Sequence, residues 1–94
     1  MYRHLLQSTT DYALQYLEGL DERSVFPTPD AIARLAELGG AFPEAPSDPA
    51  EVLSLLHEIG SPATVASAGS RYFGFVTGGS LPATLAANWL AGTW

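Results

Sequence analysis

Residues 69–94 read GSRYFGFVTGGSLPATLAANWLAGTW, and the interpretation of the whole chain depends on this stretch. Its first part, Arg71–Val76, combines aromatic with β-branched side chains, which predicts a short extended segment. Gly78 and Gly79 follow and predict a turn, where the backbone adopts positive φ or approaches a ligand closely. The stretch therefore predicts an aromatic strand-like segment, a glycine turn and then a new element.

That new element is a predicted helix beginning at Leu81, with Ser80 as its N-cap and Pro82 in its first turn. Large apolar side chains recur along one side of it and form a stripe: Leu81, Leu85, Trp89 and Leu90. Small residues form a second, flat face suited to close packing: Ala83, Ala86, Ala87, Ala91 and Gly92. Both faces are those of a helix that packs against other protein.

No charged residue follows Arg71. We expect the last helix to continue to Trp94 without a glycine, asparagine or basic residue to cap it. An exposed helix end is normally polar, so the sequence predicts that this chain is a fragment of a larger protein.

The stretch resembles the N-terminal region of pyridoxal-phosphate-dependent group II amino-acid decarboxylases, the family that includes the aromatic amino-acid and glutamate decarboxylases. The resemblance is carried by RYFGFVTGGSLP, residues 71–82, and by the helix containing NWLA, residues 88–91. Gly69-Ser70 stands where the family commonly has His-Pro, so the match is a variant. Upstream, residues 23–27 read RSVFP, similar to the family's Arg-x-Val-x-Pro. The resemblance covers most of this chain but only an early portion of a family enzyme.

The resemblance implies a parent enzyme of the α/β, fold-type-I class that works as a homodimer in the cytoplasm and acts on an amino acid. It places the cofactor lysine, its aspartate partner and a ring-stacking histidine beyond Trp94. It also implies that the aromatic loop lines the substrate channel, partly across the dimer interface. The residues so assigned are Phe73, Phe75, Thr77, Gly78, Gly79 and Ser80. From the residues alone, Phe73, Phe75 and Val76 are core side chains instead; the resemblance favours substrate contact for Phe75 and Thr77.

Composition excludes several classes of function. The chain has 94 residues, enough for one domain, with 47% hydrophobic and only 15% charged residues. Soluble domains usually carry about 25% charged residues, so part of this surface is predicted to meet a partner. The net charge of −6 argues against nucleic-acid and anionic-membrane binding. The absence of cysteine excludes disulfides and thiolate metal sites.

Apolar periodicity upstream completes the predicted fold, a mainly α-helical fragment of three to four helices plus the extended aromatic segment. The first helix spans Tyr2–Leu20, and its stripe packs either on this chain's own helices or on a second subunit. The second begins after Thr28, with Ile32, Leu35 and Leu38 facing inward. The third begins at Asp48 and ends at Gly60, with Val52, Leu55, Leu56 and Ile59 on one face and His57 opposite.

Catalytic chemistry is missing from this sequence. The four basic residues are all arginines, so there is no lysine to bind pyridoxal phosphate covalently. His4 and His57 have no second ligand at metal spacing. Arg71 has the chemistry to clamp a substrate carboxylate, but a structural salt bridge is favoured. Two functions remain: an N-terminal segment of a decarboxylase that dimerises and shapes a substrate channel without being catalytic, or a free-standing helical interaction module.

We predict that the isolated chain is catalytically silent. Incubation with pyridoxal phosphate followed by borohydride should leave no reduced adduct on a side chain, because the chain lacks lysine. Mass spectrometry of the digested protein checks this, and a stable stoichiometric side-chain adduct would contradict it.

Overall fold

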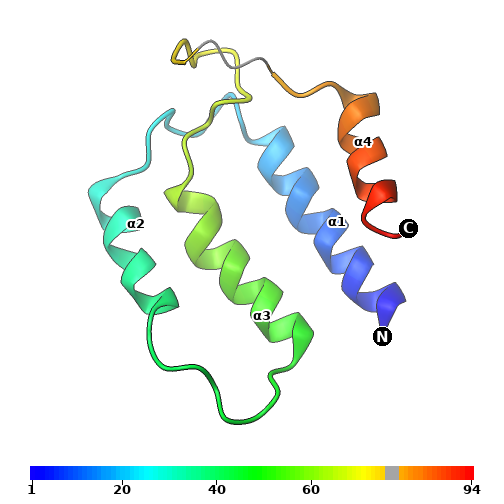
Figure 1. The fold of residues 1–94 in the computed structure, drawn as a ribbon. Helices are drawn as coiled ribbons and strands as arrows, with labels where there is room; N and C mark the ends of the chain where they lie inside the picture. The colour runs from blue at the N-terminus through cyan, green and yellow to red at the C-terminus, as the bar shows by residue number, and fades with distance from the viewer. Residues whose placement is uncertain (76–78) are drawn as a thin grey trace.

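The computed structural model describes residues 1–75 and 79–94, and all its regular elements are helical. Four α-helices are joined by irregular segments, and 3₁₀ or π-helical turns extend α2 and α3 (Figure 1). In order they are α1 (Tyr2–Glu18), α2 (Pro29–Ala33), the 3₁₀ turn η1 (Arg34–Leu38), α3 (Pro49–Leu55), the π-helical turn η2 (Leu56–Gly60), the 3₁₀ turn η3 (Ser61–Ala63) and α4 (Pro82–Ala91). The mainly helical class predicted from the sequence is confirmed.

The helices lie side by side in the order α2, α3, α1, α4 (Figure 1). α4 runs antiparallel to α1, whereas α3 runs parallel to α1 and antiparallel to α2. The molecule measures 43 × 34 × 21 Å along its principal axes. Since a helix with its side chains is about 10–12 Å across, the shortest dimension corresponds to about two helix diameters.

This arrangement buries little of the chain. Only Ile59 and Ala66 fall in the fully buried class among the described hydrophobic residues, at 1% and 2% exposure. The radius of gyration is 15.1 Å, against about 12 Å for a compact domain of this length. The chain exposes 7476 Å², whereas a compact monomer of 10.0 kDa exposes about 5,200 Å². An excess of about 2,200 Å² therefore stays open to solvent or to a partner.

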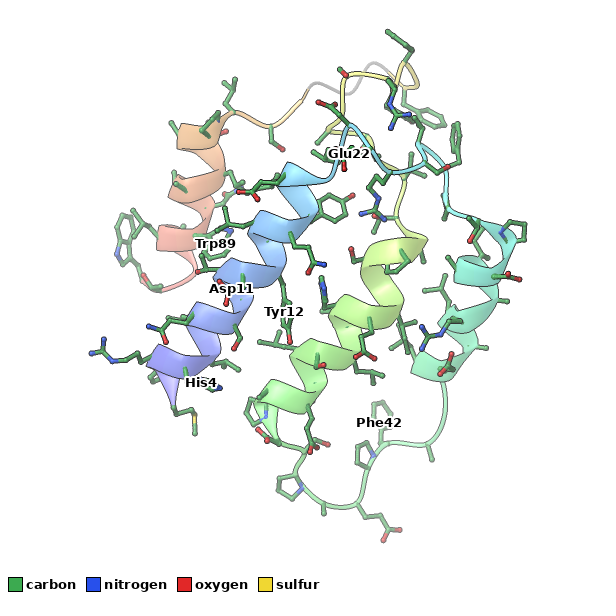
Figure 2. The ribbon with its side chains drawn as sticks, turned by 180° about the vertical axis from the view of Figure 1, so that it is seen from behind. His4, Asp11, Tyr12, Glu22, Phe42 and Trp89 are labelled. Carbon is green, nitrogen blue, oxygen red and sulfur yellow. The ribbon has the colours of Figure 1, made fainter. Side chains whose placement is uncertain are left out.

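Side-chain contacts link α1 to η2 and to the residue that follows η3. The Tyr12 ring stacks on the His57 ring at 4.2 Å between centroids and 15° between planes. Gln15 Oε1 lies 3.1 Å from His57 Nε2, and the Tyr16 hydroxyl lies 2.9 Å from the Thr64 hydroxyl. Figure 2 shows Tyr12 reaching into the space between these two helices. His57, which the sequence places opposite the stripe of Leu55, Leu56 and Ile59, forms this contact with α1.

Two helix starts occur where the sequence predicts them. Thr28 Oγ1 accepts a hydrogen bond from the Ala31 backbone N–H at 3.2 Å, and Asp48 Oδ1 accepts one from Ala50 at 3.0 Å. In each case a proline follows in the first helical turn. Backbone N–H groups in that turn have no intrahelical acceptor, so the missing N–H of proline costs no hydrogen bond. These caps are local, which is why the sequence alone identifies them.

Helix boundaries that depend on wider context differ from the predictions. Ser80 is not the N-cap of α4; Leu81 holds that position and makes no side-chain capping bond. α4 ends at Ala91 with Gly92 as its C-cap residue, so the expectation that no glycine closes this helix is wrong. Gly60 does not end the third helix either, because η2 and η3 continue the helical path to Ala63.

The extended aromatic segment is absent from the described structure. Arg71–Phe75 forms turns, a bend and irregular backbone, since the described residues offer no strand with which it could pair. The second helix also stays open. Its apolar residues Ile32, Leu35 and Leu38 retain 51%, 39% and 44% exposure, so the prediction that they face a core is wrong.

Capping of α3 by Asp48 is tested by two substitutions at the same position. Asp48→Ala should lower the free energy of unfolding by about 1 kcal/mol, because it removes the acceptor for an orphan backbone N–H. Asp48→Asn keeps that acceptor without the charge and should cost markedly less. Urea unfolding followed by circular dichroism measures both, and equal losses would show that charge rather than capping matters.

Candidate functional site

The aromatic loop is anchored by the residues that precede its phenylalanines. Ser70 Oγ donates to Asp21 Oδ1 at 3.2 Å. The Arg71 guanidinium donates to the backbone carbonyls of Leu20 and Arg23, so the salt bridge predicted for Arg71 is wrong. Tyr72 meets the Phe26 ring edge-on, with centroids 6.3 Å apart. These contacts hold the start of the loop against the chain that follows α1.

Beyond this anchor the predicted channel residues face outward. Phe73 and Phe75 are 93% and 92% exposed, so their rings are not core side chains in this structure. Ser80 is also exposed. A Cβ on Gly79 would meet the Ala68 carbonyl oxygen at an ordinary 3.7 Å. Thr77 and Gly78 lie outside the described residues.

Left-handed backbone appears at Phe75. Phe75 has φ = 56°, a conformation that costs a non-glycine residue roughly 1–2 kcal/mol. A Cβ on its neighbour Gly74 would clash with the end of the Tyr72 side chain, which would have to move. Sequence reasoning assigned positive φ to Gly78-Gly79 and missed the left-handed residue at Phe75.

A second feature, the α1–α4 groove, lies between these antiparallel helices and has a volume of about 760 Å³. It is lined by Leu6, Thr10, Ala13, Leu14, Leu17, Ser80, Leu81, Pro82, Leu85, Ala86, Trp89, Leu90 and Thr93. Figure 2 shows Trp89 on the side of α4 that faces α1. The stripe predicted on the last helix therefore does face a neighbouring helix.

The groove carries no charged side chain, and its hydroxyls are largely engaged. Thr10 Oγ1 donates to the Leu6 carbonyl at 2.9 Å, and Thr93 Oγ1 donates to the Leu90 carbonyl at 2.7 Å. Several lining side chains nevertheless stay open, including Leu81 at 65% and Leu90 at 54% exposure. An apolar trough of this kind matches the apolar face of another helix better than it matches water.

The described part of the chain meets the requirements neither of a metal site nor of a membrane-spanning helix. No group of three or more histidine, cysteine, aspartate or glutamate side chains there is placed to hold a metal ion. His4 is exposed near the start of α1, and His57 is engaged with Tyr12 and Gln15. None of the described helices has both the length and the hydropathy to span a bilayer.

Comparison with protein-family models, curated proteins and solved structures finds no match to this chain. The site is therefore interpreted from its own geometry and from the residues that carry the family resemblance.

If the α1–α4 groove is an association surface, a charge placed in it should weaken self-association of the chain. Ala86 lines the groove, whereas its exposed neighbour Ala87 does not. Ala86→Glu should shift the monomer–oligomer equilibrium at least several-fold toward monomer, because a carboxylate would be buried without a partner. Ala87→Glu adds the same charge to the same helix and should change little. Sedimentation velocity over a range of concentrations measures both; equal effects would contradict an association surface here.

Proposed function

We propose that this chain is the N-terminal part of a pyridoxal-phosphate-dependent amino-acid decarboxylase. In that role it contributes to a homodimer interface and to a substrate-channel loop, and it is not catalytic alone. The observation that carries the interface role is the exposed surface. About 2,200 Å² more than a compact monomer needs is open, and obligate interfaces bury roughly 1,000–2,500 Å² on each partner.

The small enclosed core explains why this surface needs covering. Domains are usually stable when two layers of secondary structure enclose one core, and here Ile59 and Ala66 are nearly all that is enclosed. The α1–α4 groove gives the missing layer a place to pack, because it is long, uncharged and lined by leucine and tryptophan. A partner helix in this trough would extend the packed core of the chain.

The loop role rests on the resemblance and on how the loop is held. Arg71 and Tyr72 fix its start, while Phe73 and Phe75 project from it with more than nine-tenths of their surface open. Exposed aromatic rings on an anchored loop are suited to form the wall of a pocket shared with other protein. The amino-acid side chain of a substrate is the group such a wall would contact.

The residues of this chain do not fit a covalent pyridoxal phosphate site. There is no lysine anywhere in the sequence, so cofactor attachment belongs to the remainder of the parent enzyme. The alternative, a free-standing helical interaction module, is favoured by the α1–α3 packing, since the Tyr12–His57 stack holds two helices together without any partner. The two proposals differ in whether a lysine-bearing domain follows Trp94 in the gene.

In the parent enzyme, Phe75→Ala should raise KM or alter the preference among amino-acid substrates while leaving the cofactor absorbance unchanged. Loss of the Phe75 ring removes apolar contact with the substrate worth roughly 1–3 kcal/mol. Phe42→Ala is the matched control, because Phe42 is 97% exposed in the loop between η1 and α3. Steady-state kinetics over several amino acids measures the effect. Loss of the cofactor with unchanged substrate preference, or equal effects of the two substitutions, would refute the channel assignment.

A further inference from the structure

A second pocket lies on the other side of α1 from the groove, at the junction with η2 and η3. Its volume is about 370 Å³, within the range of roughly 300–1,000 Å³ typical of small-molecule sites. Unlike the α1–α4 groove, it is lined by polar and titratable groups, among them Gln15, Tyr16, Arg23, His57, Glu58 and Ser61. It belongs neither to the aromatic loop nor to the proposed interface.

Arg23 is the fixed cation of this pocket. Its guanidinium carbon lies 4.6 Å from the centroid of the Tyr16 ring, and its Nη2 donates to the Ser61 carbonyl at 2.6 Å. The side chain is half-buried. These two contacts hold the guanidinium in place before any ligand arrives, which lowers the entropic cost of binding.

Arg23 has no carboxylate partner among residues 1–75 and 79–94. The ion pair found there joins Arg34 to Glu37, at 2.9 Å. A guanidinium carries five N–H donors in a planar fork, and the hydrogen bond to Ser61 engages one side of it. A held, half-buried arginine that lines a pocket and forms no ion pair has donors left for a planar anion.

Neighbouring groups add a neutral donor and an apolar wall. When His57 Nε2 donates to Gln15 Oε1 across their 3.1 Å contact, the amide NH₂ of Gln15 is left to donate to a ligand. Pro62 and the Tyr16 ring, which line the same pocket, offer apolar surface. The π-helical turn η2 carries His57, and such wide turns are frequent at functional sites.

Glu58 limits which anions the pocket accepts. Glu58 is one of the residues that line the pocket. Its negative charge, in a chain of net charge −6, repels a dianion about twice as strongly as a monoanion.

We propose that this pocket binds a small organic monocarboxylate, with the carboxylate on the Arg23 guanidinium and the organic part against Pro62 and Tyr16. The planar fork matches a planar carboxylate better than a tetrahedral phosphate, and Glu58 disfavours the second charge of phosphate. This site goes beyond the proposed function, because it requires neither the parent enzyme nor its cofactor.

Titration of the 94-residue chain with propionate and benzoate, followed by NMR at constant ionic strength, tests the proposal. We expect saturable shifts that cluster at the backbone amides of Gln15, Tyr16 and His57 and at the side-chain Nε of Arg23. Inorganic phosphate should bind more weakly than either carboxylate. Shifts that fail to saturate or that spread over the chain would overturn the site, and equal or tighter phosphate binding would overturn the assigned ligand class.

Three charge substitutions sharpen the test. Arg23→Gln should weaken carboxylate binding roughly tenfold or more, since it removes a charged hydrogen-bond donor. Arg3→Gln removes the same charge from an exposed position at the start of α1 and should change affinity little. Glu58→Gln should tighten binding several-fold, because a like charge leaves the pocket.

Circular dichroism shows whether Arg23→Gln disturbs the fold. If it does, the change in carboxylate affinity caused by Glu58→Gln still tests the proposal. Weaker carboxylate binding after Glu58→Gln would mean that the pocket does not hold an anion beside Glu58, and the proposal would fail. Equal losses from Arg23→Gln and Arg3→Gln would also overturn it, because they would show a response to net charge alone.

Discussion

Burial is the constraint on which this structure depends. Four helices lie side by side and enclose apolar side chains mainly along the seams between neighbours. The seam between α1 and the α3–η2 helix is closed by Tyr12, His57 and Gln15, and Ile59 of η2 is almost fully buried. The seam between α1 and α4 stays open as an apolar groove. A chain with 47% hydrophobic residues therefore presents much of its apolar surface outside.

This distribution separates the molecule into two regions with different chemistry on either side of α1. Toward α4 the surface is uncharged. Its threonine hydroxyls donate to backbone carbonyls four and three residues earlier in the chain, so they offer few hydrogen bonds to water. Toward η2 and η3 the surface carries Arg23, His57, Glu58 and amide groups. Apolar association and polar recognition can thus proceed on opposite sides of one helix without competing for the same residues.

The arginines of the chain have two kinds of partner. Arg34 pairs with Glu37 on the surface, where such a pair adds little stability. Arg71 and Arg23 instead donate to backbone carbonyls of the chain that follows α1 and of η3. The Ser61 carbonyl also accepts from the backbone N–H and hydroxyl of Thr64, so the bond from Arg23 adds a third donor there and ties the chain after α1 to η3. The aromatic loop is positioned by this junction, which links its geometry to that of the pocket beside Arg23.

Local signals in the sequence determined the parts of the structure that depend on neighbours in the chain. Thr28-Pro29 and Asp48-Pro49 start helices because the side-chain oxygen accepts a free backbone N–H of the first turn and proline suits that turn. The apolar stripe of α4 follows from the spacing of its residues. The tertiary structure alone decided features that need a distant partner. His57 turned inward because Tyr12 offers a ring to stack on, and Arg71 met carbonyls rather than a carboxylate. The aromatic segment formed no strand, because backbone pairing requires a second strand and none is present among the described residues.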